Sequence, residues 1–203
     1  MGRNSSGTRG GLQPGDSSYK GSIKNVESLI KIKDPQVYKE VTSAIARFHS
    51  VLGVRERNVK LADLSAGTLG VQTTSVATGQ STGVYINKKV FNQKKKAIVA
   101  QQKKGYDSGW STKTNKPIAH VITHELGHAL WNSDLGGANH KAAGKDINKL
   151  YNSWLKDKKK KGYGQYSKSN VDEFWAELVT KAVHGTADKY TKRAKSIAKK
   201  YGL

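Results

Sequence analysis

Two histidines and a glutamate within residues 120–131, which read HVITHELGHALW, have the types and spacing of a catalytic metal site. His124 and His128 are four residues apart, so on a helix both imidazoles face the same side and can reach one ion at about 2.0–2.1 Å. Glu125 is rotated by about 100° from His124, which lets its carboxylate face a water beside the ion. Two neutral imidazole ligands and a carboxylate base suit metal-assisted hydrolysis. The alternative is a chance pair of histidines on an ordinary helix.

Two imidazoles do not complete a zinc site, so a third ligand must come from another segment. Asp134 falls six residues after His128, where enzymes with the motif H-E-x-x-H-x-x-G-x-x-H place theirs, but Trp131 stands where that geometry needs glycine. His140 is a second alternative. Gly127, inside the motif, has no side chain and would let another segment approach closely.

The favoured third ligand lies in NVDEFWAEL, residues 170–178. Glu173 and Glu177 are four residues apart, so on a helix they project from one side. Apolar neighbours surround both, which predicts that at least one is partly buried, and a metal is a good partner for a buried carboxylate. If Glu173 binds zinc, Glu177 is placed to accept the N–H of a ligating histidine. A solvated acidic face is the alternative.

In this order the two segments resemble the C-terminal catalytic domain of anthrax toxin lethal factor and its relatives, over about residues 118–192. In that family the H-E-x-x-H helix is followed by a tyrosine, six residues, a glutamate, three residues and a second glutamate. Tyr166, Glu173 and Glu177 reproduce this spacing.

The resemblance implies a role for each matching residue. His124, His128 and Glu173 match the zinc ligands, Glu125 the general base, Tyr166 a tyrosine that stabilises the oxyanion, and Glu177 a supporting carboxylate. A phenol near zinc can donate to a developing negative oxygen, although Tyr163, three residues earlier, competes for this role. The expected function is therefore that of a zinc-dependent metalloendopeptidase. The family also suggests a toxin or effector, or a phage-encoded protease domain, as the setting.

The chain is strongly basic, with 36 Lys and Arg against 15 Asp and Glu, for a formal net charge of +21. Lysine clusters at residues 94–96, 103–104 and 156–161 supply much of it. This charge favours acidic or nucleic-acid-associated protein substrates and non-specific nucleic-acid binding, unless the lysines only form a solvated surface. Two other functions stay open: a basic virion- or nucleic-acid-associated binding protein with a vestigial or structural metal site, and a metal hydrolase that acts on something other than peptides.

Composition excludes further chemistry and leaves the cellular location unknown. The chain has no cysteine, which rules out disulfides, thiolate nucleophiles and cysteine-type zinc sites. No apolar run approaches the roughly 18 residues that span a bilayer, and residues 1–11 lack the apolar core of a secretion signal. Gly2 and Ser6 match the loose pattern of N-myristoylation. A phage virion and a delivered effector would both suit these features.

We expect an α+β fold: a mostly helical, zincin-like metallopeptidase domain at residues 19–203, with a small sheet and two metal-bearing helices. Residues 1–18, rich in Gly and Ser, are expected to form a flexible tail or linker. Strands are predicted at 59–62 and 84–86, and residues 84–87 could add a strand of substrate at the sheet edge. Helices are expected at residues 35–52, from Pro117 to Gly136 at most, at 145–156, from about Asn170, and at 189–200. Residues 105–116 are expected to form a polar loop.

Overall fold

The structure, a computed structural model, describes residues 22–75, 81–132 and 138–203. The predicted tail at residues 1–18 lies outside them. The strands are β1 (Lys24–Glu27), β2 (Val59–Asp63), β3 (Gly70–Thr74) and β4 (Ser81–Asn87). The helices are α1 (Pro35–Leu52), α2 (Lys88–Phe91), α3 (Lys95–Asp107), α4 (Pro117–Trp131), α5 (Ala138–Lys156), α6 (Val171–His184) and α7 (Lys189–Tyr201), with two short 3-10 helices, η1 (Leu29–Lys31) and η2 (Gln165–Lys168). The fold is mostly helical with a small sheet, as the α+β prediction states.

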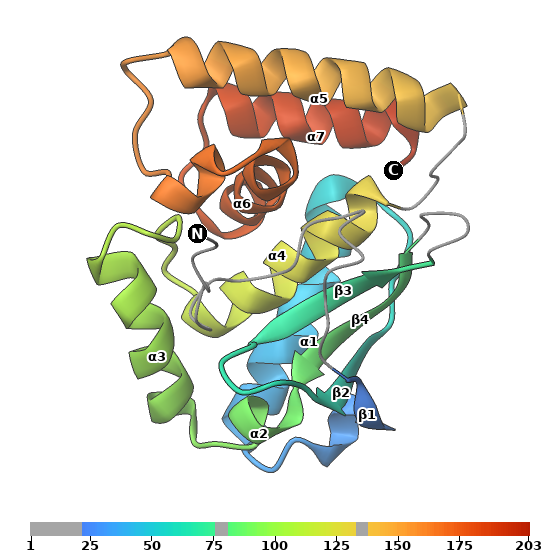
Figure 1. Cartoon of the computed structure of the whole chain (residues 1–203), viewed down its shortest axis with the longest axis vertical. Coiled ribbons are helices and arrows are strands. Elements are labelled where there is room, and N and C mark those ends of the chain that lie inside the picture. The colour runs from blue at the N-terminus through green and yellow to red at the C-terminus, as the bar shows by residue number, and fades with distance from the viewer. Residues whose placement is uncertain (1–21, 76–80, 133–137) are drawn as a thin grey trace, which may run out of the picture.

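The four strands form a mixed sheet in the order β1-β2-β4-β3. β2 and β4 are parallel, whereas β1 pairs with β2 and β3 pairs with β4 in antiparallel fashion. The predicted strands at 59–62 and 84–86 are present, but the prediction that residues 84–87 form the sheet edge is wrong. β3 pairs along the outer side of β4, so β4 is an inner strand and β3 is the edge strand (Figure 1).

The starts of several helices were predicted correctly because capping residues mark them in the sequence. Asp34 accepts hydrogen bonds from the backbone N–H groups of Gln36 and Val37 at the start of α1, and Gly53 ends α1 with a φ of 67°. α4 begins at Pro117, α6 is capped by Asn170, and α7 begins at Lys189 as predicted. α5 begins at Ala138 rather than 145. α2 and α3 were not among the expected helices, and the end of α3, up to Asp107, lies in the predicted loop at 105–116.

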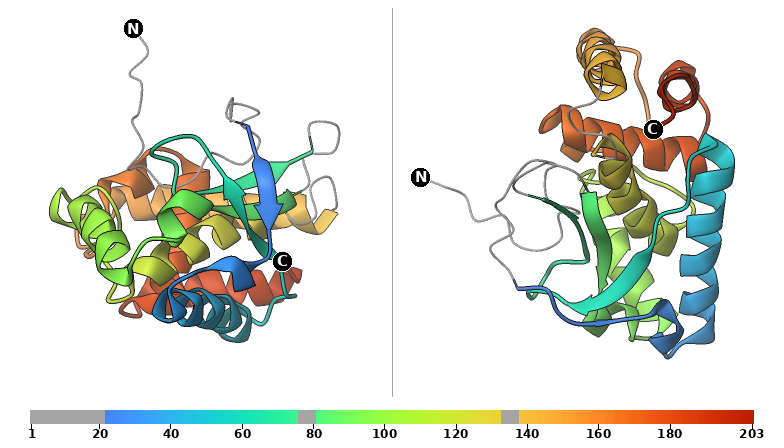
Figure 2. Two further views of the ribbon diagram at one scale, coloured as in Figure 1. Left: turned by 90° about the horizontal axis from the view of Figure 1, so that it is seen from below. Right: turned by 90° about the vertical axis from the view of Figure 1, so that its right-hand side faces the viewer.

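α4 lies at the centre of the molecule. It contacts β3 and β4 on one side, and α1, α3 and α6 on others, as the two views of Figure 2 show together. Residues 118–130 of this helix are all buried. α5 and α7 run side by side as an outer layer beyond α6 (Figure 1). A helix that is buried all round can hold polar side chains only where partners surround them, which makes α4 the natural carrier of an internal polar site. No helix in the part of the chain that the structure describes has the length and apolarity needed to span a bilayer.

The contact between α4 and α6 depends on Gly127, as its position in the motif predicts. A Cβ added at Gly127 would lie 2.9 Å from the Cα of Ala176 on α6. Real Cβ atoms do not approach a backbone atom so closely, so only glycine allows the two helix backbones to come this near. The close approach brings the histidines of α4 within reach of the glutamates of α6.

We expect Gly127→Ala to lower the free energy of unfolding by about 1–3 kcal/mol, because the added methyl group forces α4 and α6 apart. Gly144→Ala on α5 is the matched control. Its Cβ would meet nothing nearer than the Trp131 ring at 3.8 Å, so this change should leave stability equal or raise it by up to about 1 kcal/mol. Urea unfolding followed by circular dichroism measures both. A Gly127→Ala protein as stable as the wild type would contradict the close packing.

Candidate metal centre

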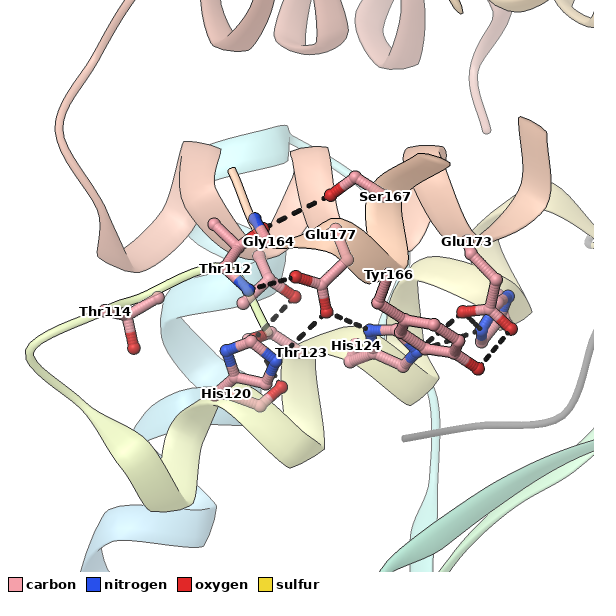
Figure 3. Close-up of polar contacts among 12 residues, drawn as sticks. Thr112, Thr114, His120, Thr123, His124, Gly164, Tyr166, Ser167, Glu173 and Glu177 are labelled. Carbon is pink, nitrogen blue, oxygen red and sulfur yellow. Dashed lines mark hydrogen bonds and ion pairs between the residues drawn. The ribbon is translucent and has the colours of Figure 1, made fainter. Parts of the chain in front are cut away.

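Three buried side chains from α4 and α6 converge on one point. Figure 3 shows two of them, with His124 of α4 facing Glu173 of α6. The Nε2 atoms of His124 and His128 are 3.1 Å apart. The Glu173 Oε2 atom lies 3.2 Å from the first and 3.4 Å from the second. All three residues are at most 1% exposed. The structure therefore brings the predicted zinc ligands of two distant segments together.

The spacing of these three donor atoms fits a single metal ion. Donors at about 2.0–2.1 Å from a tetrahedral ion are about 3.3–3.4 Å from one another. The three separations seen here, 3.1, 3.2 and 3.4 Å, are close to that value. Two imidazole nitrogens and one carboxylate oxygen are also a donor set that zinc accepts. The residues present thus fit a zinc ion, with the two helices supplying the ligands.

Glu173 is held in place by its position on α6. The Asn170 side chain caps the helix by accepting hydrogen bonds from the N–H groups of Asp172 and Glu173, each at 2.9 Å. Glu173 therefore sits in the first turn, where the helix dipole favours a carboxylate. Burial by itself would raise its pKa, but the imidazoles of His128 and His124 lower the pKa of Glu173 to about 2. It is consequently ionised, as a metal ligand must be.

Glu177, one turn further along α6, supports His124 from behind. Its Oε1 atom lies 3.0 Å from His124 Nδ1 and 3.1 Å from His120 Nε2, and its Oε2 atom accepts the Thr112 N–H at 2.7 Å. When Nδ1 of His124 donates to Glu177, its Nε2 lone pair faces His128 and Glu173. This is the supporting contact predicted for Glu177.

The charges of the centre suit a cation. Burial favours the neutral forms, yet Glu173 and Glu177 raise the pKa of His124 well above its usual value. Burial likewise opposes ionisation of Glu177, but His120 and His124 hold its pKa well below the usual range. Without a metal, a proton on His124 balances these buried carboxylates. A divalent ion could replace that proton, because metal binding requires neutral imidazole ligands.

His120 is a member of the site that the sequence reading missed. It lies four residues before His124 and donates toward the same Glu177 oxygen. His120, His124 and Glu177 are also close enough to form a second potential metal group. We interpret this group as a hydrogen-bonded support for the metal ligands rather than as a second metal site. The reason is that Glu177 already accepts hydrogen bonds from the Thr112 N–H and from His124 Nδ1. The i, i+4 spacing of His120 and His124 was the signal that could have revealed it.

Glu125, the predicted general base, is fully buried on α4 and packs against the edge strand. A Cβ on Gly70 of β3 would lie 2.8 Å from Glu125 Cγ and 3.3 Å from its Oε1. A cavity of about 10 Å³ borders both His124 and Glu125. This volume is close to the smallest that holds one water molecule. The carboxylate therefore lies against β3 and borders a small cavity that His124 also lines.

Tyr166 faces the centre, and Tyr163 does not. The Tyr166 hydroxyl donates to Glu173 Oε1 at 2.7 Å, and its ring stacks on that of His124 with centroids 5.8 Å apart. Burial, together with the charge of Glu173, raises the pKa of Tyr166 well above its usual value, so the hydroxyl stays protonated. Tyr163 instead donates to Asp188 at 2.8 Å. Of the two competing tyrosines, Tyr166 is the one near the candidate ligands.

The segment before α4 sets the position of Tyr166. The Tyr166 N–H donates to the Trp110 carbonyl at 2.9 Å, and the Gln165 N–H donates to that of Gly109 at 2.9 Å. A Cβ on Gly164 would lie 2.2 Å from the Trp110 carbonyl oxygen, so the two segments touch backbone to backbone. The same segment supplies the Thr112 N–H to Glu177. One backbone pairing thus positions both the tyrosine and the supporting carboxylate.

The sequence offers two alternative third ligands, Asp134 and His140. Asp134 lies outside the described residues. The His140 ring, on α5, packs edge-on against Trp131 with centroids 5.6 Å apart, and His140 belongs to neither of the candidate metal groups. Glu173 is thus the third donor residue in the described group that contains both His124 and His128.

Comparisons with known proteins give no match: no family model, no curated protein and no solved structure is similar to the chain.

Proposed function

We propose that this chain is a zinc-dependent metalloendopeptidase with a zincin-like domain, as its resemblance to the lethal factor family implies. The observation that carries this proposal is the triangle of His124, His128 and Glu173 donors, 3.1–3.4 Å on each side. A buried carboxylate, Glu125, lies next to the triangle. Two imidazoles, a carboxylate and an adjacent carboxylate base support metal-assisted hydrolysis over a purely packing role.

Each side chain then has a distinct task in peptide hydrolysis. Zinc, when bound, would act as a Lewis acid and make a coordinated water more acidic. Glu125 takes a proton from the attacking water and passes it to the leaving nitrogen. Tyr166 keeps its proton and can donate to the carbonyl oxygen as negative charge develops there. Glu177 holds His124 in the tautomer that leaves Nε2 free to bind.

An extended peptide would lie along β3. This strand pairs with β4 on one side, and among the described strands it has no partner on the other. It also passes Glu125 at Gly70. A substrate that adds a strand there would present its backbone to the base, so β3 takes over the role that residues 84–87 were predicted to play. The net charge of +21 favours an acidic or nucleic-acid-associated substrate protein, which suits both a delivered effector and a phage-encoded protease.

The second candidate function is a basic binding protein with a structural metal, and one observation favours it. The three donor residues are at most 1% exposed, and structural zinc sites are closed, whereas catalytic ones keep a position open to water and substrate. The peptidase function would require the site to open to substrate. A measurement of peptide hydrolysis therefore distinguishes the two proposals.

The proposal is tested by incubating the zinc-loaded protein with a peptide library derived from a proteome. We expect cleavage with a consistent sequence preference, its loss on chelation, and its recovery when zinc is returned. An empty cleavage profile from protein that holds one equivalent of zinc would favour a structural metal or a non-peptide substrate.

Tyr166→Phe should lower kcat by about 100-fold and leave zinc content unchanged, because it removes one donor to the oxyanion. Tyr163→Phe is the matched control. It removes a hydroxyl that bonds Asp188 away from the centre and should leave kcat within about twofold of the wild type. Steady-state kinetics and metal analysis measure both variants. The contrary result is a Tyr166→Phe protein that loses zinc but keeps the wild-type kcat per bound zinc ion. It would show that this hydroxyl positions Glu173 rather than acting on the substrate.

A further inference from the structure

A second hollow of the molecule is lined by lysines and lies outside the metal centre. It has a volume of about 610 Å³ and is formed by the segment after α5, the turn between α6 and α7, and residues Lys113 and Lys181. Figure 1 shows that the end of α5 and the start of α7 lie at the same end of the helical layers. The lining of this hollow includes six lysines and two aspartates: Lys113, Lys159, Lys160, Lys161, Lys181, Lys189, Asp157 and Asp188. We call it the lysine pocket.

Both aspartates of the lysine pocket are already neutralised within the fold. Asp157 pairs with Lys189 at 2.8 Å and accepts the Tyr190 hydroxyl at 2.7 Å. Asp188 pairs with Lys181 at 2.8 Å and caps α7. The two acids therefore cancel the charges of two lysines and leave an excess of four positive charges in the lining.

Of the four lysines that carry this excess, three are exposed to solvent. Lys113, Lys159 and Lys161 are exposed, and none of the described carboxylates lies within 4.0 Å of their ammonium groups. They come from two segments, the one before α4 and the one after α5, which the fold brings to one hollow. Positive charges this close together repel one another. An anion that binds among the three lysines is therefore attracted by all three ammonium groups.

Hydrogen bonds to backbone carbonyl groups hold the loop that carries Lys159 and Lys161 in shape. Lys181 is only 6% exposed, and its Nζ donates to the Lys161 carbonyl at 2.8 Å. The same ammonium lies 3.8 Å from the centre of the Tyr163 ring. Lys160 in turn donates to the carbonyl groups of Leu155 and Asp157, at 2.9 and 3.0 Å. A loop anchored on both sides loses little freedom when a ligand binds.

We propose that the lysine pocket binds a small polyphosphorylated anion, with its phosphate groups on Lys113, Lys159 and Lys161. Lysine is a point-charge phosphate ligand with three N–H donors, and the pocket volume lies in the range typical of small-ligand sites. The lining offers no free aromatic face for a base, since Lys189 covers the Tyr190 ring at 5.0 Å. Phosphate groups are thus the recognised chemistry, and the site does not depend on the proposed peptidase function.

Calorimetric titration of the full-length protein with sodium tripolyphosphate at constant ionic strength tests this proposal. We expect saturable binding at one site per chain. The triple variant Lys113→Gln, Lys159→Gln, Lys161→Gln should bind at least about tenfold more weakly, because it removes charge-assisted hydrogen bonds. The matched control is Lys39→Gln, Lys96→Gln, Lys104→Gln, three exposed lysines of α1 and α3 without a described ion pair. It removes the same charge and should change affinity by no more than about twofold.

Three outcomes would overturn the proposal. The first is no saturable binding by the wild type. The second is an equal loss of affinity in both triple variants, which would assign the effect to overall charge. The third comes from a parallel titration with a short DNA duplex: if the pocket variant loses DNA binding but keeps tripolyphosphate binding, the lysines form a nucleic-acid surface instead. Unfolding curves of both variants, matched to the wild type, show that each is folded.

Discussion

Replacement of Glu125 by glutamine is expected to lower kcat for peptide hydrolysis by about 10²–10⁴-fold, with zinc near one equivalent per chain. Glutamine keeps the shape of the side chain and its packing against Gly70, but its amide cannot take a proton from water. Because Glu125 is not among the three clustered donors, the metal group stays whole. Steady-state kinetics together with metal analysis of the same sample give both quantities.

Glu56→Gln is the control for this substitution. Glu56 is exposed in the connection between α1 and β2, so the same chemical change there should leave kcat unaltered. Equal activity of the Glu125→Gln protein and the wild type would defeat the assignment of Glu125 as the base. Loss of zinc together with activity would show that Glu125 holds the metal group together rather than acting on water.

Glu173→Ala is expected to weaken zinc binding by more than about 100-fold, because it leaves two imidazoles without their third ligand. Glu177→Ala should weaken it by about 10–100-fold, since His124 loses the acceptor that orients its ring. Asp134→Ala should bind zinc as the wild type does. Competition with a chromophoric chelator measures all three affinities, and circular dichroism checks that each variant is folded.

The order of these three affinities distinguishes the ligand sets. A protein that keeps zinc after Glu173→Ala but loses it after Asp134→Ala would place the third ligand six residues after His128, in the sharp-turn geometry. An effect of Glu177→Ala as large as that of Glu173→Ala would favour the neighbouring group of His120, His124 and Glu177.

The residues of the site could be predicted because their spacing is a property of single helices. His124 and His128 on α4, and Glu173 and Glu177 on α6, each share a face through the i, i+4 relation. Gly127 indicated that another segment approaches there, and the contact with Ala176 shows that this segment is α6. The capping residues Asp34 and Asn170 likewise act within a few residues of the chain.

What could not be predicted depends on contacts between distant segments. β3 lies in a Thr- and Ser-rich stretch that looks like a loop, and it becomes a strand by pairing with β4. Strand order is likewise not a local property, which explains the wrong assignment of the sheet edge to residues 84–87. The Thr112 N–H that binds Glu177 is a backbone group, so no side-chain pattern marks it. The lysine pocket shows the same limit, because Lys113 and Lys161 are far apart in the sequence.

A crystal structure of the zinc-loaded protein, with anomalous scattering recorded at the zinc edge, tests the central claim most directly. We expect one anomalous peak within about 2.0–2.2 Å of His124 Nε2, His128 Nε2 and a Glu173 carboxylate oxygen. A peak between His120, His124 Nδ1 and Glu177, or a Glu173 side chain turned away from the two imidazoles, would contradict it.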